Sequence, residues 1–306
     1  MALQDILKNL NPEKLGLKVL SEEELHSVQA TLEMMLHDFD KVCSKHSIEW
    51  CLFGGSVIGT VRHNGFIPWD DDIDIFMTRR NYNRFSEIVE LELGKKYILK
   101  EPGRKNYIYH FPQLQLRHTE VESIQTTERA NDGLFIDIFI LENVPNNKIL
   151  RGLHGGLCTL LLFIDSAIRQ KECKNHILKY AGTDEETVKT VNKRAMFAKL
   201  FAFKSFEKWL ALSDKVFSLC KDDNSKYVSC PSGRLHYFKE TYLRAKMCEY
   251  VKHKFESHEW NIPKGYKYYL RKRYGDNYMI IPPRDKQEKH IYVKLDLSNN
   301  SKGDIS

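Results

Sequence analysis

The chain has 306 residues, of which 42% are hydrophobic and 29% charged, and its formal net charge is +6 at pH 7. This length allows one large domain or two ordinary ones, and the composition is typical of a soluble globular protein. The first residues lack the continuous apolar run and the cleavage site of a signal peptide. The longest apolar stretch, residues 157–168, is too short to span a bilayer and contains Asp165. We therefore expect a cytoplasmic protein.

The cysteines and the charge distribution limit which metal sites, disulfides and binding partners we expect. Seven cysteines at irregular spacing, with no CxxC pair, favour reduced thiols over a zinc cluster or a disulfide framework. Residues 241–294 hold thirteen Lys/Arg against six Asp/Glu. This basic segment predicts either a solvated face or an attraction to phosphates, those of a substrate or of an anionic membrane surface. No nucleic-acid-binding motif accompanies it, so we expect no nucleic acid partner.

The first part of the chain alternates between helical and strand patterns. Residues 21–46 predict a helix, because Ser21 and Glu24 form a capping box and apolar residues follow at three- and four-residue steps. A short strand is expected at 49–53, broken by Gly54-Gly55-Ser56. One or two helical turns are expected at 56–63 and a loop at 64–68. A strand of alternating acidic and apolar residues is expected at 72–77, followed by a helix at 79–89 that Thr78 caps.

The remaining segments complete an α+β pattern. Strands are predicted at residues 97–100, 107–111, 114–118 and 134–141. Residues 149–220 read as several helices, and within them residues 195–212 favour core packing over a membrane interface. Short strands return after residue 227, and a helix is expected to end at Gly275.

Four aspartates within five positions are the most unusual feature of the sequence: Asp70, Asp71, Asp72 and Asp74. Two carboxylates about 4 Å apart repel by roughly 4 kcal/mol at an effective dielectric constant of 20, so they need a positive group between them or contact with water. Asp72 and Asp74 are two positions apart on the predicted strand, so their side chains share one face. A calcium loop is excluded, because Ile75 and Asn81 stand where it requires Gly and Glu.

A third carboxylate occurs in the apolar strand LFIDIFIL. Asp137 is costly to bury there unless it is paired with a cation or binds a metal. A salt bridge is one interpretation. The other places Asp137 beside Asp72 and Asp74 on adjacent strands, where three carboxylates suit Mg²⁺ or Mn²⁺ and, through it, phosphoryl transfer. Upstream, the backbone of Gly54-Gly55-Ser56 allows close approach of a phosphate.

Longer blocks of sequence carry a family resemblance. These blocks are GGSVIGTVRHNGFIPWDDDIDIFM at 54–77, GLFIDIFILENVP at 133–145, SKYVSCPSGRLHYF at 225–238, and KFESHEWNIPKGYKYYLRKRYGDNYMIIPP at 254–283, followed by His290. The order of strand, Gly-Gly-Ser, D-x-D strand and third Asp strand resembles the nucleotidyltransferase superfold of the DNA polymerase β type. The blocks more closely resemble the LicD family, which is related to fukutin.

The resemblance implies a metal-dependent transferase that uses a CDP-activated phospho-alcohol. The implied fold is a mixed sheet flanked by helices, with an inserted helical region. By the same resemblance, Gly55 and Ser56, with Gly54, bind the donor phosphates, and Asp72, Asp74 and Asp137 are the catalytic residues and hold Mg²⁺ or Mn²⁺. CDP-choline is the favoured donor, and a glycan, teichoic acid precursor or lipid-linked glycan is the expected acceptor, with release of CMP. Choline is not distinguished from ribitol or another alcohol.

Additional side chains are candidates for substrate contacts. Arg62 and His63 lie between the Gly-Gly-Ser turn and the acidic strand, and Trp69 suits either the core or a cation–π contact with a quaternary ammonium. Arg234, His236 and His290 are further candidates for donor or acceptor contacts. Any of the aspartates, Asp70 and Asp71 included, could accept the proton of the acceptor hydroxyl. Five tyrosines suit sugar or choline binding as well as helical packing: Tyr266, Tyr268, Tyr269, Tyr274 and Tyr278.

Two other functions stay open at this point. One is a nucleotidyltransferase that activates a sugar or alcohol phosphate and releases pyrophosphate. The other is a catalytically silent binding protein of glycan assembly, which the three costly aspartates disfavour. A lipid-linked acceptor would bring the protein to the inner face of the plasma membrane as a peripheral protein, helped by the basic segment at about 1 kcal/mol per cation.

The expected organisation has five parts. An N-terminal helical segment at 1–48 packs on a catalytic core at 49–148, and a helical region follows at 149–226. A basic and aromatic part at 227–297 completes the site, and the polar residues 298–306 form a disordered tail.

Overall fold

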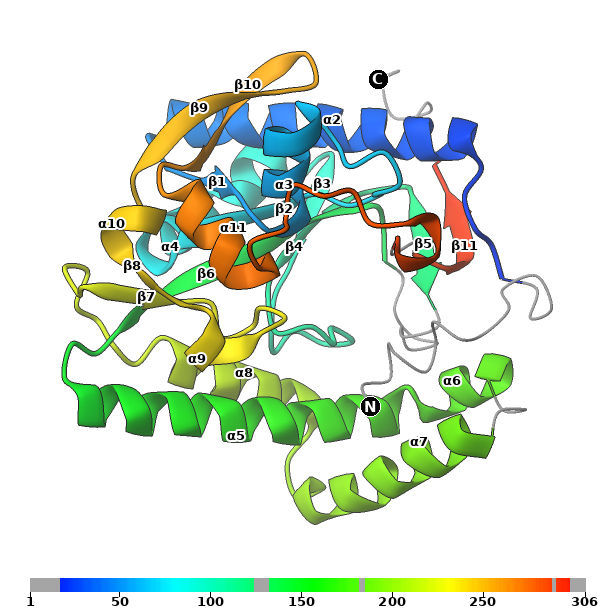
Figure 1. Ribbon diagram of the computed structural model, residues 1–306. Helices are drawn as coiled ribbons and strands as arrows, with labels where there is room; N and C mark the ends of the chain where they lie inside the picture. Colours follow the sequence, from blue (N-terminus) through cyan, green and yellow to red (C-terminus); the bar gives the residue numbers. More distant parts are fainter. Residues whose placement is uncertain (1–16, 124–131, 182–184, 288–289, 298–306) are drawn as a thin grey trace.

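The computed structural model describes residues 17–123, 132–181, 185–287 and 290–297 of the chain. The predicted tail at 298–306 and the first sixteen residues lie outside the described residues. A twisted sheet fills the centre of the protein, with helix α2 (Glu22–Lys45) along one side and the long helix α5 (Lys148–Glu172) along the other (Figure 1).

The central sheet is mixed, as the sequence predicts. Its main path runs β1-β2-β6-β4-β3, and β7 and β8 extend it from the second half of β6. Strands β2 and β6 are parallel and the other pairs are antiparallel. The strands are β1 Cys51–Leu52, β2 Asp74–Thr78, β3 Tyr97–Lys100, β4 Gln113–Leu116, β6 Phe135–Val144, β7 Tyr227–Ser229 and β8 Thr241–Leu243.

Helices and two hairpins surround this sheet. The capping box of Ser21 and Glu24 is present at the start of α2, and buried residues of this helix pack in the main core with the apolar faces of β2 and β6. The helices here are α2 Glu22–Lys45, α3 Gly54–His63, α4 Arg79–Leu93, α9 His236–Lys239, α10 Arg244–Met247, η3 Arg284–Lys286 and α11 Tyr266–Tyr274. The hairpins pair β9 Tyr250–Phe255 with β10 His258–Pro263, and β5 Glu120–Ser123 with β11 Tyr292–Asp296.

A separate helical layer follows β6 in the chain. It has its own core of buried apolar side chains, distinct from the core around the central sheet. Its elements are α5 Lys148–Glu172, α6 Lys174–Ala181, α7 Glu185–Ala198, η2 Lys199–Phe201 and α8 Phe206–Phe217. Within the described residues, α5 is the one helix that is long and apolar enough to cross a membrane, judged by length and composition alone. The helices of this layer lie between Lys148 and Phe217, and the division of the chain with a helical region at 149–226 stays a prediction.

Several predicted boundaries differ from the structure. The expected strand at 107–111 is irregular, because the Tyr107 hydroxyl donates to the Phe111 carbonyl at 2.6 Å and Pro112 lacks the N–H that a strand would use. Strand β2 starts at Asp74, so Asp72 precedes it. The strand expected at 49–53 is only Cys51–Leu52, since Gly54 already begins α3.

Candidate active site at the start of strands β2 and β6

The acidic strands lie next to each other in the sheet. Asp74, the first residue of β2, is directly opposite Asp137 of β6 in the parallel register. On the other side of β6, Gln113 of β4 is opposite Asp137 and donates from its Nε2 to Asp137 Oδ1 at 2.8 Å. Neighbouring strands are about 4.8 Å apart, so residues in register share one face. Asp137 is therefore beside Asp74, as predicted, and its carboxylate accepts a hydrogen bond from an amide and not from a cation.

The Gly-Gly-Ser turn holds the acidic segment in place. Gly54 has a φ of +53°, and a Cβ atom on it would overlap Asp74 Oδ2. A Cβ on Gly55 would lie 3.0 Å from Asp70 Oδ2. The Asp74 N–H donates to Ser56 Oγ at 3.0 Å. Only glycine permits this close approach, because it has no side chain and tolerates positive φ. The N-terminus of α3, with its partial positive charge, thus faces the carboxylates.

The carboxylates raise one another's pKa values. Desolvation raises the pKa of Asp74 well above its usual value, and the charges of Asp72 and Asp137 raise it further. Desolvation is also the largest cause that raises the pKa of Asp72 and Asp70. The pKa of Asp137 rises to about 8, since desolvation and Asp72 outweigh the hydrogen bond from Gln113. Such mutual repulsion is the electrostatic signature of a site that favours added positive charge.

His290 and Arg273, from the C-terminal part of the chain, supply positive charge near the carboxylates. His290 Nδ1 and the Tyr292 hydroxyl both bind the Asp71 carboxylate, the latter at 2.8 Å. Desolvation lowers the pKa of His290, but its hydrogen bond with Asp71 and the surrounding carboxylates raise it to about 10. Arg273 of α11 forms an ion pair with the buried Glu240, and its charge also lowers the pKa of Asp74. Both groups come from sequence far beyond the acidic strand.

The other predicted contact residues divide into two groups. Arg62 donates to the carbonyls of Tyr278 and Ile280 at 3.1 and 3.3 Å, and its guanidinium lies 6.0 Å from the ring of Trp69. The half-buried Trp69 is therefore neither a core tryptophan nor free for a quaternary ammonium on that face.

His63 and His236 have different surroundings. The His63 ring accepts from Arg62 Nε at 2.9 Å and packs edge-on against Trp69. Arg234 and His236 flank the start of α9 and are exposed. The pKa of His236 is lowered by desolvation and by the charge of His110, and His110 itself binds Asp165 of α5.

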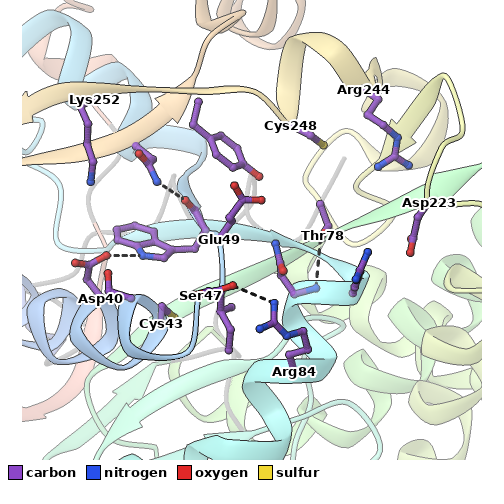
Figure 2. A pocket seen from close by; sticks show the side chains of 17 residues that line it. Asp40, Cys43, Ser47, Glu49, Thr78, Arg84, Asp223, Arg244, Cys248 and Lys252 are labelled. Carbon is purple, nitrogen blue, oxygen red and sulfur yellow. Dashed lines mark hydrogen bonds between the residues drawn. The ribbon is translucent and has the colours of Figure 1, made fainter.

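A polar cavity of about 560 Å³ lies elsewhere (Figure 2). It is lined by Thr78, the last residue of β2, and by side chains that include Asp40, Glu49, Arg84, Arg244 and Lys252. Because Asp74 begins β2 and Thr78 ends it, this cavity is at the opposite end of the strand. None of the three predicted catalytic aspartates lines it.

The donor set around Asp137 fits a hard divalent cation in its chemistry. Carboxylates and an amide are the oxygen ligands that Mg²⁺ and Mn²⁺ prefer. Their oxygens are not yet gathered: among the described residues, the one group of three carboxylate, imidazole or thiol ligand atoms within 4.8 Å of one another is Glu33, His37 and His258. That group is on α2 and the β9–β10 hairpin and includes none of the aspartates.

Sequence reasoning missed three contributors to the site. Gln113 is in an expected strand, but nothing local marks it as a partner of Asp137. Arg273 is one cation in the run LRKRY, and only its pairing with Glu240 distinguishes it. Tyr269, considered above for sugar or choline, instead accepts a hydrogen bond from Gly54 N at 2.9 Å.

Comparisons with known proteins identify the domain that carries this site. Residues 47–153 match the family described as LicD/FKTN/FKRP, nucleotidyltransferase domain. Over 262 residues the chain is 29% identical to the lipopolysaccharide cholinephosphotransferase LicD of Haemophilus influenzae, covering 84% of this chain and 91% of that protein. A shorter match, 32% identical over 59 residues, covers 19% of this chain and 19% of an uncharacterized protein of Rickettsia typhi. Residues 47–153, which carry Asp72, Asp74 and Asp137, therefore resemble the nucleotidyltransferase domain of the LicD family.

Proposed function

We propose that this protein is an enzyme that transfers phosphocholine from CDP-choline to a sugar hydroxyl of a cell-surface glycan precursor, with release of CMP. The match of residues 47–153 to the LicD family and the activity named for the Haemophilus influenzae relative support a phosphotransferase. The adjacency of Asp74 and Asp137 on parallel strands is the observation that carries the proposal. The architecture is consistent with a nucleotidyltransferase-type fold, which we include in the proposal.

Each part of the site has a task in this reaction. The N–H groups at the start of α3 and the charges of Arg273 and His290 favour the diphosphate of the donor. Asp72, Asp74 and Asp137 would hold Mg²⁺ or Mn²⁺. Such an ion would offset the charge that develops on the phosphates and on the leaving CMP. Gln113 orients the Asp137 carboxylate through its hydrogen bond.

The proton of the acceptor hydroxyl requires a carboxylate outside this set. Asp71 has one oxygen bound to His290 and the other to Tyr292. Asp70 is the remaining candidate, because desolvation and its acidic neighbours raise its pKa well above the usual value. A carboxylate with a raised pKa is a stronger base once it is deprotonated, and the positive charge of a bound divalent ion would favour the deprotonated form. We assign this role to Asp70.

The basic segment at 241–294 contributes less free charge than its composition indicates. Arg273 pairs with Glu240, Lys264 with Glu249, and Lys294 with Glu120. Arg244 donates to the Ser225 carbonyl at 2.6 Å. We still propose a cytoplasmic protein that binds the inner face of the plasma membrane. Because these cations are already paired within the protein, another surface is a better candidate for membrane binding.

A donor panel tests the proposed reaction. The purified protein is incubated separately with CDP-choline, CDP-ribitol or CDP-glycerol in the presence of Mg²⁺ or Mn²⁺ and a soluble sugar whose hydroxyl accepts the phospho-alcohol, and CMP is measured. We expect CMP release to be fastest from CDP-choline and to fall at least a hundredfold in Asp74→Asn. Asp276→Asn, which alters an exposed carboxylate in the turn after α11, is the matched control and should retain full activity. Pyrophosphate from CTP and phosphocholine, without CMP from any CDP-alcohol, would favour the nucleotidyltransferase alternative.

A further inference from the structure

The outer face of α5 is apolar and exposed. Its large side chains point away from the protein and are between 42% and 73% exposed: Ile149, Leu150, Leu153, Leu157, Leu160 and Phe163. Steps of three and four residues place them in one stripe along the helix. Single exposed apolar residues are ordinary on a protein surface, but a continuous stripe of this kind marks an interaction site.

The stripe continues onto the neighbouring helix. Met196 at the end of α7, Leu200 in η2 and Phe203 just after it are between 66% and 76% exposed. Phe163 contacts Phe197 of α7, with ring centroids 5.3 Å apart. In Figure 1, α5 and α7 lie together at the side of the protein opposite α2. We call these nine residues, six on α5 and three on α7, η2 and the turn after η2, the apolar face.

The helical layer that carries the apolar face has an excess of cations. Residues 148–217 contain thirteen Lys/Arg and seven Asp/Glu in the sequence. Two of the acids are engaged inside the protein: Asp165 binds Ser213 and His110, and Asp214 pairs with Arg79. Lys148, Lys193 and Lys199 are exposed. An identical copy docked on this face would meet the same cations, so charge disfavours a symmetric dimer.

An anionic bilayer satisfies both the apolar and the charged parts of this surface. We propose that the apolar face lies in the headgroup region of an anionic membrane, with α5 parallel to its plane. The helix does not cross the bilayer, because its inner side is fixed to the protein by buried polar groups. His154 Nε2 contacts the Val216 carbonyl at 2.8 Å, and Asp165 is fully buried. This proposal is independent of the transfer chemistry.

Vesicle binding tests it. The full chain is sedimented with phosphatidylcholine vesicles, with and without phosphatidylglycerol, at low and high salt. We expect binding to the anionic vesicles that is weakened but not abolished by salt, and at least a tenfold loss in the double variant Leu153→Glu/Leu160→Glu. Leu91→Glu is the matched control, because Leu91 is an 89% exposed leucine on α4, outside the apolar face.

Three outcomes would overturn the proposal. They are no binding by the natural protein, equal binding by the double variant, and a dimer in solution that the double variant dissociates. Circular dichroism and thermal unfolding of the double variant keep the test valid, since both leucines are exposed and their replacement should leave the fold intact. CMP release with a water-soluble acceptor should also be unchanged, which separates this test from that of the proposed function.

A second observation carries an independent inference. Glu33 and His37 are one helical turn apart on α2, so their side chains project from the same side. His258, at the start of β10, joins them: its Nδ1 lies 2.9 Å from His37 Nε2 and 3.4 Å from Glu33 Oε1. Both imidazole rings pack against Trp260, with centroids 4.9 and 5.5 Å from the indole. The three ligand atoms are thus held together by packing.

We infer that Glu33, His37 and His258 bind a zinc-type transition metal that fastens the β9–β10 hairpin to α2. Two imidazoles and one carboxylate are a known ligand type for Zn²⁺. Bonds of about 2.0–2.1 Å in a tetrahedron separate ligand atoms by about 3.3 Å, close to the spacing seen here. Ser257 donates its hydroxyl to Glu33 Oε1 at 2.7 Å and so orients the carboxylate.

Cobalt substitution gives a direct readout. Co²⁺ added to the metal-free protein should produce the visible absorption of a tetrahedral site at one equivalent, and Zn²⁺ should remove it and raise Tm. His37→Gln should abolish the absorption, whereas His26→Gln, on the same helix but bound to the Glu22 carbonyl, should leave it intact. An absent signal in the natural protein, or one that survives in His37→Gln, would refute the inference. CMP release is not needed for either result.

Discussion

Asp137 shows how one residue in an apolar strand sets the character of a site. Its carboxylate accepts from Gln113, lies in register with Asp74, and has a pKa of about 8. An acid whose pKa is raised by folding destabilises the fold when it ionises. The site therefore stores unfavourable electrostatic energy, which a bound cation would offset.

The variant Asp137→Asn tests whether the ionised carboxylate of Asp137 destabilises the fold. Asparagine can still accept from Gln113 but carries no charge, so we expect the metal-free variant to be more stable than the natural protein. The sign follows from the raised pKa: the natural carboxyl costs nothing below about pH 4 and progressively more up to about pH 8. The difference in Tm between Asp137→Asn and the natural protein should therefore increase as the pH rises from 4 to 9. A constant difference would contradict the prediction, and CMP release should be lost at every pH.

Gly54 is the second residue whose chemistry is set by its neighbours. At Gly54→Ala the new methyl would overlap Asp74 Oδ2 in a backbone with φ +53°. We expect a loss of stability of about 1–3 kcal/mol and a fall in turnover of more than tenfold. Urea unfolding and CMP release measure the two effects.

The matched control for that substitution is Gly152→Ala. Gly152 is on the exposed side of α5, with nothing within 4 Å of its Cβ position. Alanine stabilises a helix interior relative to glycine by about 1 kcal/mol, so the control should gain stability and retain turnover. Equal losses in both variants would show that Gly54 is not specially constrained.

At the scale of elements, helix α11 completes a site that begins two hundred residues earlier. It packs near α3, with Tyr269 accepting from Gly54 N and Arg273 directed at the aromatic ring of Phe53 at 5.1 Å. Its end at Gly275, with φ +85°, follows from the glycine there, as the sequence predicts. The contact between α11 and α3 depends on long-range packing, and no local sequence pattern predicts it.

Tyr269→Phe should loosen this contact. Removal of the hydroxyl leaves the buried Gly54 N–H without its acceptor, which costs about 1–3 kcal/mol. We expect a lower unfolding midpoint in urea and, because we propose that α3 binds the donor phosphates, an increased KM for the CDP donor. Tyr266→Phe, a half-buried tyrosine of the same helix, serves as the control and should change neither quantity. An unchanged midpoint in Tyr269→Phe would argue against this role for the hydroxyl.

At the scale of the whole molecule, one arginine joins the central sheet to the helical layer. Arg79, at the start of α4, pairs with Glu142 of β6 and with Asp214 of α8. Glu142 is almost completely buried, so its charge depends on this partner. The two hydrophobic cores are thereby held in one orientation.

Arg79→Met should destabilise the protein strongly. Breaking a buried ion pair by removing one partner costs about 3–5 kcal/mol, because the remaining charge is left without compensation. Arg80→Met, which alters the exposed neighbour, is expected to have little effect. Calorimetry should show a lower Tm for Arg79→Met, and the helical layer is expected to unfold first. A change below 1 kcal/mol would mean that the layers dock without this link.

The sequence by itself determined much of the fold, because local patterns are set by local physics. The capping box at Ser21, the stop at Gly275 and the apolar strand around Asp137 all required no knowledge of the rest of the chain. The family resemblance also rested on contiguous blocks, and the comparisons confirm it. The roles of the three aspartates stay predictions.

The tertiary structure alone decided which residues meet. Gln113, Arg273 and Tyr269 join the site through strand register and helix packing, which act between positions far apart in the chain. The apolar pattern of α5 predicts a helix whether or not its apolar residues are buried. Which side of the helix is buried and which is exposed depends on what packs against it. Periodicity reports the conformation of a segment, whereas its neighbours are fixed only when the whole chain has folded.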